Sequence, residues 1–103
     1  MEKQIKFCGI KIHKGDREAI YELFKSVGRT PEDFYKPDNQ GRIRIENNRV
    51  HYIDANSLGL PSLPETIGNL GSLQRLDVRG NRLNKGSINL IKRIKARGVL
   101  VIS

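Results

Sequence analysis

Hydrophobic residues in the second half of the chain follow a spacing that predicts a bend. The stretch LQRLDVRGNRL begins at Leu73, and its apolar positions are Leu73, Leu76, Val78 and Leu83. One face of a plain helix or a plain strand cannot hold all of them. We therefore predict a short extended segment that points Leu76 and Val78 inward. Asn81 then turns the chain by bonding free main-chain groups at the corner.

The same pattern recurs with a period of 23 residues, since Val50 lies 23 positions before Leu73 and Ala96 lies 23 positions after it. The apolar residues in phase are Val50, Ile53, Ala55 and Leu60 before this stretch, and Ala96, Val99 and Val101 after it. Leu58 stands where the earlier copy would need an asparagine. One such unit cannot bury its own apolar face. We therefore predict three stacked parallel strands with Ile53, Leu76 and Val99 at equivalent positions.

The LxxLxLxxNxL spacing of residues 73–83 resembles the leucine-rich repeat, which is about 20 to 29 residues long. Between the first two copies, the sequence LPSLPETIGNLGS is similar to the return half of the plant-type repeat. That similarity implies that Leu63, Ile67 and Leu70 lie in the core. The resemblance implies an α/β (α+β) fold, a short right-handed solenoid of about two and a half repeats behind an N-terminal hairpin-plus-helix cap.

The chain is expected to form a single domain of 103 residues. Its parts would be an N-terminal cap (1–49), repeat 1 (50–72), repeat 2 (73–95) and the terminal strand of a partial third repeat (96–103). A cap is needed because the first repeat would otherwise expose its hydrophobic cross-section. The arrangement is similar to the cap that precedes plant-type repeats, but the paired cysteines of that cap are missing here.

Two hairpins are predicted in the N-terminal half. Ile5 and Phe7 alternate with polar residues, and Ile10 and Ile12 do so in the opposite parity, which indicates a two-residue turn at Cys8-Gly9. The second hairpin spans residues 42–53, with Asn47-Asn48 as its turn because asparagine tolerates positive φ. The expected closing layer of the core is Phe7, Ile20, Phe24, Phe34 and Ile43.

Helical spacing appears three times. The first helix would begin with Asp16 as N-cap and stop at Gly28, with Ala19, Ile20, Leu23, Phe24 and Val27 inside. Thr30 and Pro31 predict a short second helix through Tyr35. Near the C-terminus, the inward positions of a return helix would be Ile88, Ile91 and Ile94, with Lys92, Arg93 and Lys95 on its wet side.

The composition of the chain bears on its location in the cell and on the distribution of its charge. No apolar run approaches membrane-spanning length, and the opening residues lack the apolar core of a secretion signal. Cys8 is the single cysteine, so it has no disulfide partner in the chain, and we expect it to be buried. We therefore predict a protein of the reducing cytoplasm that does not bind membranes. Residues 73–103 carry eight Lys or Arg against one Asp. This excess either keeps the protein soluble or attracts nucleic acid or an acidic ligand through residues 75–97.

Function is expected on the exposed strand positions, which parallel stacking would bring into ladders. The expected ladders are His51, Gln74 and Arg97; Tyr52, Arg75 and Gly98; Asp54, Asp77 and Leu100; and Asn56, Arg79 and Ile102. Candidate partner-binding residues are Tyr52, Asp54, Arg75, Asp77, Arg79 and Arg97, a composition favoured at protein interfaces. In the structural alternative, the two aspartates merely pair with the arginines of neighbouring strands.

We therefore expect a non-enzymatic module that binds an unidentified protein, with no catalytic residue, cofactor or metal. His13 and His51 fall in different hairpins and have no metal-ligand spacing. Two alternatives remain: a basic binder of nucleic acid or acidic ligands through residues 75–97, and a minimal self-associating repeat unit. Because Val99–Ile102 would be an open, apolar strand edge, a homodimer through it belongs to the second alternative.

Overall fold

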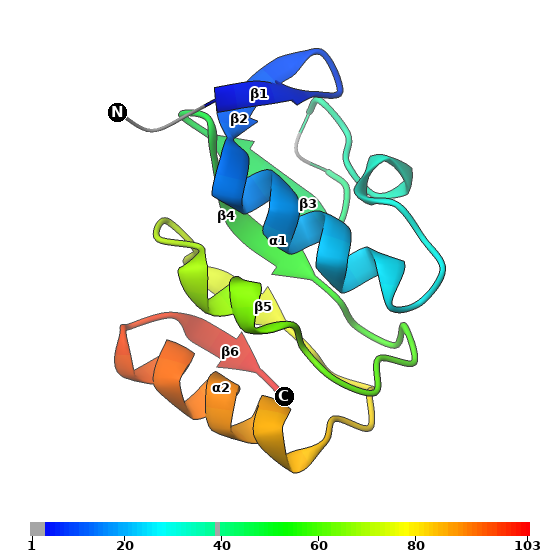
Figure 1. The fold of residues 1–103 in the computed structure, drawn as a ribbon, viewed down its shortest axis with the longest axis vertical. Helices are drawn as coiled ribbons and strands as arrows, with labels where there is room; N and C mark the ends of the chain where they lie inside the picture. Colours follow the sequence, from blue (N-terminus) through cyan, green and yellow to red (C-terminus); the bar gives the residue numbers. More distant parts are fainter. Residues whose placement is uncertain (1–3, 39) are drawn as a thin grey trace.

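Within residues 4–38 and 40–103, which the computed structural model describes, the chain forms two α-helices and two sheets in a mixed α+β fold (Figure 1). The strands are β1 (Gln4–Phe7), β2 (Ile10–His13), β3 (Ile43–Glu46), β4 (Arg49–Asp54), β5 (Arg75–Asp77) and β6 (Leu100–Ile102). The helices are α1 (Lys14–Lys25) and α2 (Lys85–Ala96), with short 3-10 helices η1 (Pro31–Asp33) and η2 (Glu65–Asn69).

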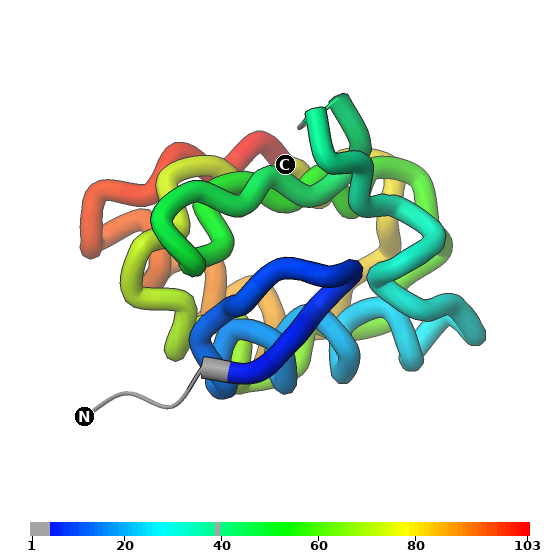
Figure 2. The backbone as a smooth tube through the Cα atoms, turned by 90° about the horizontal axis from the view of Figure 1, so that it is seen from above, coloured from blue at the N-terminus to red at the C-terminus, as the bar shows by residue number. Residues whose placement is uncertain are grey.

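The larger sheet has the order β3-β4-β5-β6. β3 is antiparallel to β4, whereas β4, β5 and β6 are parallel, as the repeated pattern predicts. Parallel strands need a crossover connection, which is supplied first by η2 and then by α2. Figure 2 shows these strands along one side of the molecule and α1 along the other, so that the core lies between the two layers.

The register of the first two parallel strands is as predicted, and that of the third is not. Ile53 lies opposite Leu76, a step of 23 residues, but Leu76 lies opposite Val101, a step of 25. The predicted equivalence of Val99 is therefore wrong. A helix rises only about 1.5 Å per residue. The connection from β5 to β6 contains the twelve-residue α2, whereas the connection from β4 to β5 is mostly extended and contains only the short η2. The second connection therefore needs more residues to return to the sheet, which lengthens the step from 23 to 25.

The corner asparagine behaves as its spacing predicts. The Oδ1 atom of Asn81 accepts a hydrogen bond from the main-chain N–H of Leu60 at 2.8 Å. Its Nδ2 atom donates to the carbonyl oxygens of Ala55 at 2.8 Å and Val78 at 2.9 Å. One side chain thus satisfies main-chain groups that follow two neighbouring strands, β4 and β5, and holds the two corners together.

Both hairpins form at the predicted turns. Phe7 lies opposite Ile10, and Cys8 has a φ of 51°, while Asn47 and Asn48 have φ values of 51° and 65°. The prediction that Cys8 is buried is wrong, because a side chain in a two-residue turn projects from the tip of the hairpin into solvent.

The prediction that Asp16 caps the first helix is also wrong. The helix begins at Lys14, so that Asp16 lies within its first turn and is completely buried. Its carboxylate accepts hydrogen bonds from Arg49 Nε at 2.9 Å, from Arg49 Nη2 at 3.1 Å and from the main-chain N–H of Val50 at 2.9 Å. The contact joins α1 directly to the first parallel strand. Thr30 is the N-cap of η1 and Pro31 its first residue, as predicted, although η1 is shorter than the helix expected there.

The inward stripe of α2 differs by one position from the prediction. Ile91 and Ile94 are buried as expected, but Ile88 is 46% exposed. Ser87 faces the core in its place, because its hydroxyl accepts the main-chain N–H of Leu63 at 2.7 Å. Asn84 caps this helix by accepting the N–H of Ser87 at 2.9 Å.

Two further residues of the repeat pattern differ from the prediction, since Ala96 ends α2 and is exposed and Leu83 is half-buried. The rest of the predicted core is confirmed. The residues buried as expected are Phe7, Ala19, Ile20, Leu23, Phe24, Ile43, Val50, Ile53, Ala55, Leu60, Leu63, Ile67, Leu70, Leu73, Leu76, Val78, Val99 and Val101. Phe34 and Val27 are only half-buried and pack against this cluster.

Replacing Asn81 by alanine is expected to lower the free energy of unfolding by about 2 kcal/mol, because main-chain groups around the corner lose their partners. Urea denaturation would measure the change. Asn69→Ala is the matched control: Asn69 is exposed, and its loss should change stability by less than about 0.5 kcal/mol. Equal effects of the two substitutions would contradict the role of Asn81.

Replacing Asp16 by alanine is expected to cost about 3 kcal/mol of stability, since it removes one member of a buried ion pair and the acceptor of the Val50 N–H. Glu18→Ala removes an exposed carboxylate from the same helix and serves as the control. Thermal or urea unfolding of both variants tests this expectation. A loss for Asp16→Ala no larger than that for Glu18→Ala would refute it.

Candidate functional site

The outward face of the larger sheet carries one row of side chains across all four of its strands. Arg44 pairs with Tyr52, Tyr52 with Arg75, and Arg75 with Leu100 in the registers of the sheet. The guanidinium carbon of Arg44 lies 5.0 Å from the centre of the Tyr52 ring, and that of Arg75 lies 5.6 Å from it. These are cation–π distances, so two cations share one ring.

A second row beside the first contains the two aspartates. Asp77 is buried and lies opposite Asp54 on one side and Ile102 on the other. Arg79 holds Asp77 with both ends of its guanidinium group, Nε to Oδ1 at 3.1 Å and Nη2 to Oδ2 at 2.8 Å. Asp54 lies 3.7 Å from Nη1 of Arg42, which precedes β3.

The hydrogen bonds from Arg79 lower the pKa of Asp77 below its ordinary value near 3.8, although burial of the carboxyl group opposes the effect. The main-chain N–H of Arg79 contributes as well, at 3.1 Å from Oδ1. Asp77 is therefore ionised at neutral pH, and its charge is used within the sheet. Asp77 pairs with Arg79 and Asp54 lies near Arg42. The structural alternative stated in the sequence analysis instead paired the aspartates with arginines of neighbouring parallel strands.

With these pairs made, Arg44 and Arg75 remain as exposed cations. Neither forms an ion pair with any residue that the structure describes. Arg44, Tyr52 and Arg75 border a shallow hollow of about 190 Å³, which Glu46, His51 and Gln74 also line. We call Arg44, Tyr52, Arg75 and Leu100 the strand-face row.

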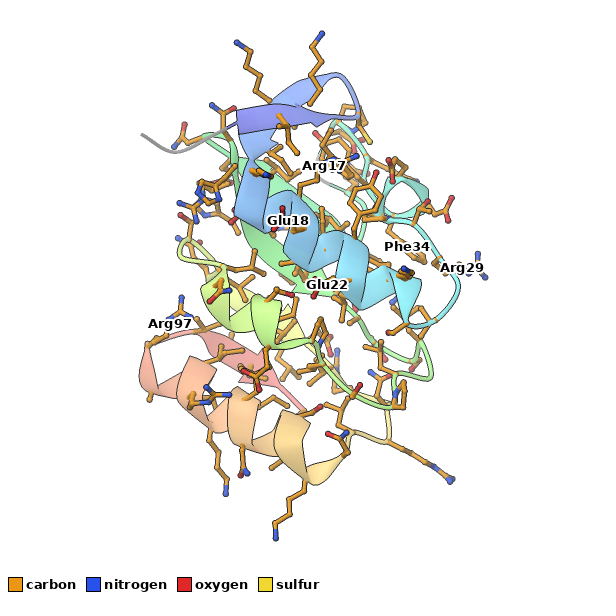
Figure 3. The ribbon with its side chains drawn as sticks, in the orientation of Figure 1. Arg17, Glu18, Glu22, Arg29, Phe34 and Arg97 are labelled. Atoms are coloured by element: carbon orange, nitrogen blue, oxygen red, sulfur yellow. The ribbon has the colours of Figure 1, made fainter. Side chains whose placement is uncertain are left out.

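Five of the six predicted site residues lie on this face: Tyr52, Asp54, Arg75, Asp77 and Arg79. The placement of the sixth, Arg97, is wrong. It lies at the turn between α2 and β6 (Figure 3), where its guanidinium group donates to the carbonyl oxygens of Gly68 and Leu70. Arg97 therefore joins the two return segments instead of continuing a ladder.

The third members of the predicted ladders are also displaced. Leu100 lies beside Arg75 where Gly98 was expected, and Ile102 lies beside Asp77 where Leu100 was expected. Sequence reasoning missed Arg44 as a member of the site. The signal was present, since Arg44 alternates with the inward residues Ile43 and Ile45 in the strand that pairs with β4.

The basic C-terminal third does not form one continuous surface. Arg79 binds Asp77, Arg93 lies 2.9 Å from Glu65, and Arg97 binds main-chain carbonyls. Besides Arg97, five cations of this segment form no ion pair with a described residue: Arg75, Arg82, Lys85, Lys92 and Lys95. They belong to a strand, a corner and a helix, and so they point to more than one surface.

The described part of the chain offers few groups suited to metal binding or to nucleophilic chemistry. Residues 4–38 and 40–103 contain no cluster of three or more His, Cys, Asp or Glu side chains suited to a metal ion. Although Cys8 is exposed, neighbouring protein atoms desolvate its thiol, and this effect and the nearby Glu32 carboxylate raise the pKa of the thiol, which disfavours the reactive thiolate. None of the described helices is both long and apolar enough to span a membrane.

Comparison with protein-family models, with curated proteins and with solved structures finds no match to this chain.

The low pKa of Asp77 predicts a pH-dependent contribution to stability. A carboxylate whose pKa is depressed by folding stabilises the native state above its unfolded pKa, and this contribution is lost as the pH falls through the folded value. Asp77→Asn should therefore be less stable than the wild type at neutral pH, and the difference should shrink below pH 3.8. Urea unfolding of both proteins across this range would measure it. A difference independent of pH would contradict the assignment.

Proposed function

We propose that this chain is a non-enzymatic protein-binding module of the leucine-rich repeat type, built as a short solenoid behind an N-terminal cap. The 23-residue step from Ile53 to Leu76 and the corner made by Asn81 support the repeat. The hairpins and α1 support the cap, since they precede the repeats and since Asp16 of α1 accepts the main-chain N–H of Val50 in the first parallel strand. The partner would bind the exposed face of the parallel strands.

The observation that carries this proposal is the pair of cations on Tyr52. Aromatic residues and arginine are enriched at protein interfaces and in their energetic centres. Tyr52 offers a rigid ring, while Arg44 and Arg75 on either side form no ion pair with a described residue that would have to break before they meet a partner. Leu100, 57% exposed, extends the row with an apolar contact.

The alternative in which residues 75–97 bind nucleic acid as one basic surface receives less support. Arg79, Arg93 and Arg97 already have partners within the molecule. Self-association through β6 has one observation in its favour. Among the described residues, β6 pairs with β5 alone, whereas the outer edge of β3 also meets Tyr35. The outer edge of β6 is therefore the one available to a second copy.

Affinity capture with charge-reversed variants tests the proposal. The wild type, Arg44→Glu/Arg75→Glu, and the control Lys11→Glu/Lys25→Glu would each be immobilised and exposed to extract from the cells that produce the protein. Lys11 and Lys25 are exposed on β2 and α1, so the control makes the same change in net charge elsewhere. Proteins bound to the wild type should fall at least about tenfold on the Arg44/Arg75 variant, which equals a loss of about 1.4 kcal/mol.

The control should retain the same proteins as the wild type. Equal loss from both double variants would mean that net charge alone drives capture and would contradict a specific strand face. Recovery of further copies of this chain alone would favour self-association. Circular dichroism of the three proteins would establish that each is folded.

A further inference from the structure

A second, larger hollow lies at the end of the molecule opposite the N-terminal hairpin. Its volume is about 480 Å³, within the range of about 300 to 1,000 Å³ typical of ligand sites. The corner after β5 forms one wall and α2 the other, and Ser103 at the end of β6 also lines it. We call it the end hollow.

The floor of the end hollow is aliphatic and open to solvent. Val78 and Ile91 are buried there, Leu83 is half-buried, and Ile88 is 46% exposed. Ile88 and Leu100 are the exposed large hydrophobic residues of the described chain, and only Ile88 belongs to this hollow. The exposure of Ile88 follows from the placement of Ser87 in the core. An aliphatic contact at Ile88 would remove this surface from water.

The rim of the end hollow is positively charged. Arg82, Lys92 and Lys95 line it, and none of them forms an ion pair with a described residue. No Asp or Glu is present among its described lining residues. Ile88, Lys92 and Lys95 are spaced i, i+4 and i+7 on α2, which places the apolar contact and two of the cations on one helix face.

The positive charge of the rim favours one kind of ligand in the end hollow over others. A second copy docked end to end would place the same cations against one another, and like charges across an interface are costly. An anionic occupant would instead find three cations whose interactions are unused. The described lining residues include no aromatic side chain on which a nucleic-acid base could stack. Ser103, which lines the hollow, directly follows β6, and the outer edge of that strand offers main-chain groups with which a polypeptide can pair.

We propose that the end hollow binds an acidic polypeptide segment that carries aliphatic side chains. The aliphatic side chains contact Ile88 and Leu83, and the carboxylates pair with Arg82, Lys92 and Lys95. This surface shares none of these residues with the strand-face row, so either proposal can fail while the other stands.

Fluorescence anisotropy with a labelled peptide of alternating leucine and glutamate tests this proposal on the full chain. The wild type should bind the peptide, and Ile88→Ser and Lys92→Glu/Lys95→Glu should each weaken binding at least about tenfold. Ile88 is exposed, so its replacement by serine spares the core and keeps the test informative should the double variant fold poorly. Lys11→Glu/Lys25→Glu, with the same change in charge, should bind as the wild type does.

Several outcomes would overturn the proposal. Absence of binding at millimolar protein would do so, as would equal binding of a peptide in which serine replaces leucine, since net charge would then suffice. Equal weakening by Lys11→Glu/Lys25→Glu would have the same meaning. Loss of binding in Arg44→Glu/Arg75→Glu alone would assign the peptide to the strand face. Tighter binding of a single-stranded oligonucleotide, weakened by Lys92→Glu/Lys95→Glu, would assign the end hollow to nucleic acid.

Discussion

The buried carboxylate of Asp16 is the contact on which the arrangement of this molecule depends. Isolated charges are costly to bury, and a buried ion pair is tolerated only when its hydrogen-bonding groups are satisfied. Here the two Asp16 oxygens receive three hydrogen bonds from Arg49 and the Val50 N–H, at 2.9 to 3.1 Å. Because Asp16 belongs to α1 and Arg49 begins β4, this geometry fixes where the helix lies over the first parallel strand.

The position of β4 then determines which side chains reach solvent. Successive residues of a strand point to opposite faces, so a shift of one residue would exchange the inward and outward sets. Val50, held by Asp16, and Ile53 are both buried although they lie three positions apart, because β4 carries one extra residue, His51, where its pairing with β3 shifts register. Beyond this irregularity the alternation resumes, so that Tyr52 faces outward and Ile53 enters the core. β5 continues the same alternation, and Asn81 keeps the two corners in step. The residues that face outward are thus determined by the packing of the core.

Local patterns predicted most of this fold because their causes are local. The Cys8-Gly9 turn, the corner at Asn81 and the step from Ile53 to Leu76 follow from turn chemistry and periodicity. The errors concern contacts between distant segments. Asp16 carries a typical N-cap signal, but its partner Arg49 is 33 positions away. Periodicity alone could not distinguish Ser87 from Ile88, because a hydroxyl bond to Leu63 decides between them. The register of β6 depended on the length of α2, and Arg97 left the predicted ladder with it.

The positively charged side chains fall into groups that make different contacts. Arg97 satisfies carbonyl oxygens between the return segments, and Arg79 and Arg93 hold carboxylates, so their charges are used inside the molecule. Among the other cations, Arg44 and Arg75 lie next to Tyr52 on the strand face. Arg82, Lys92 and Lys95 line the end hollow together with Ile88. Charge screened within about 10 Å at moderate salt acts over the width of one such surface. Under the two proposals, each surface would attract anionic groups independently, and the neighbouring aromatic or aliphatic side chain would determine what else a partner must carry.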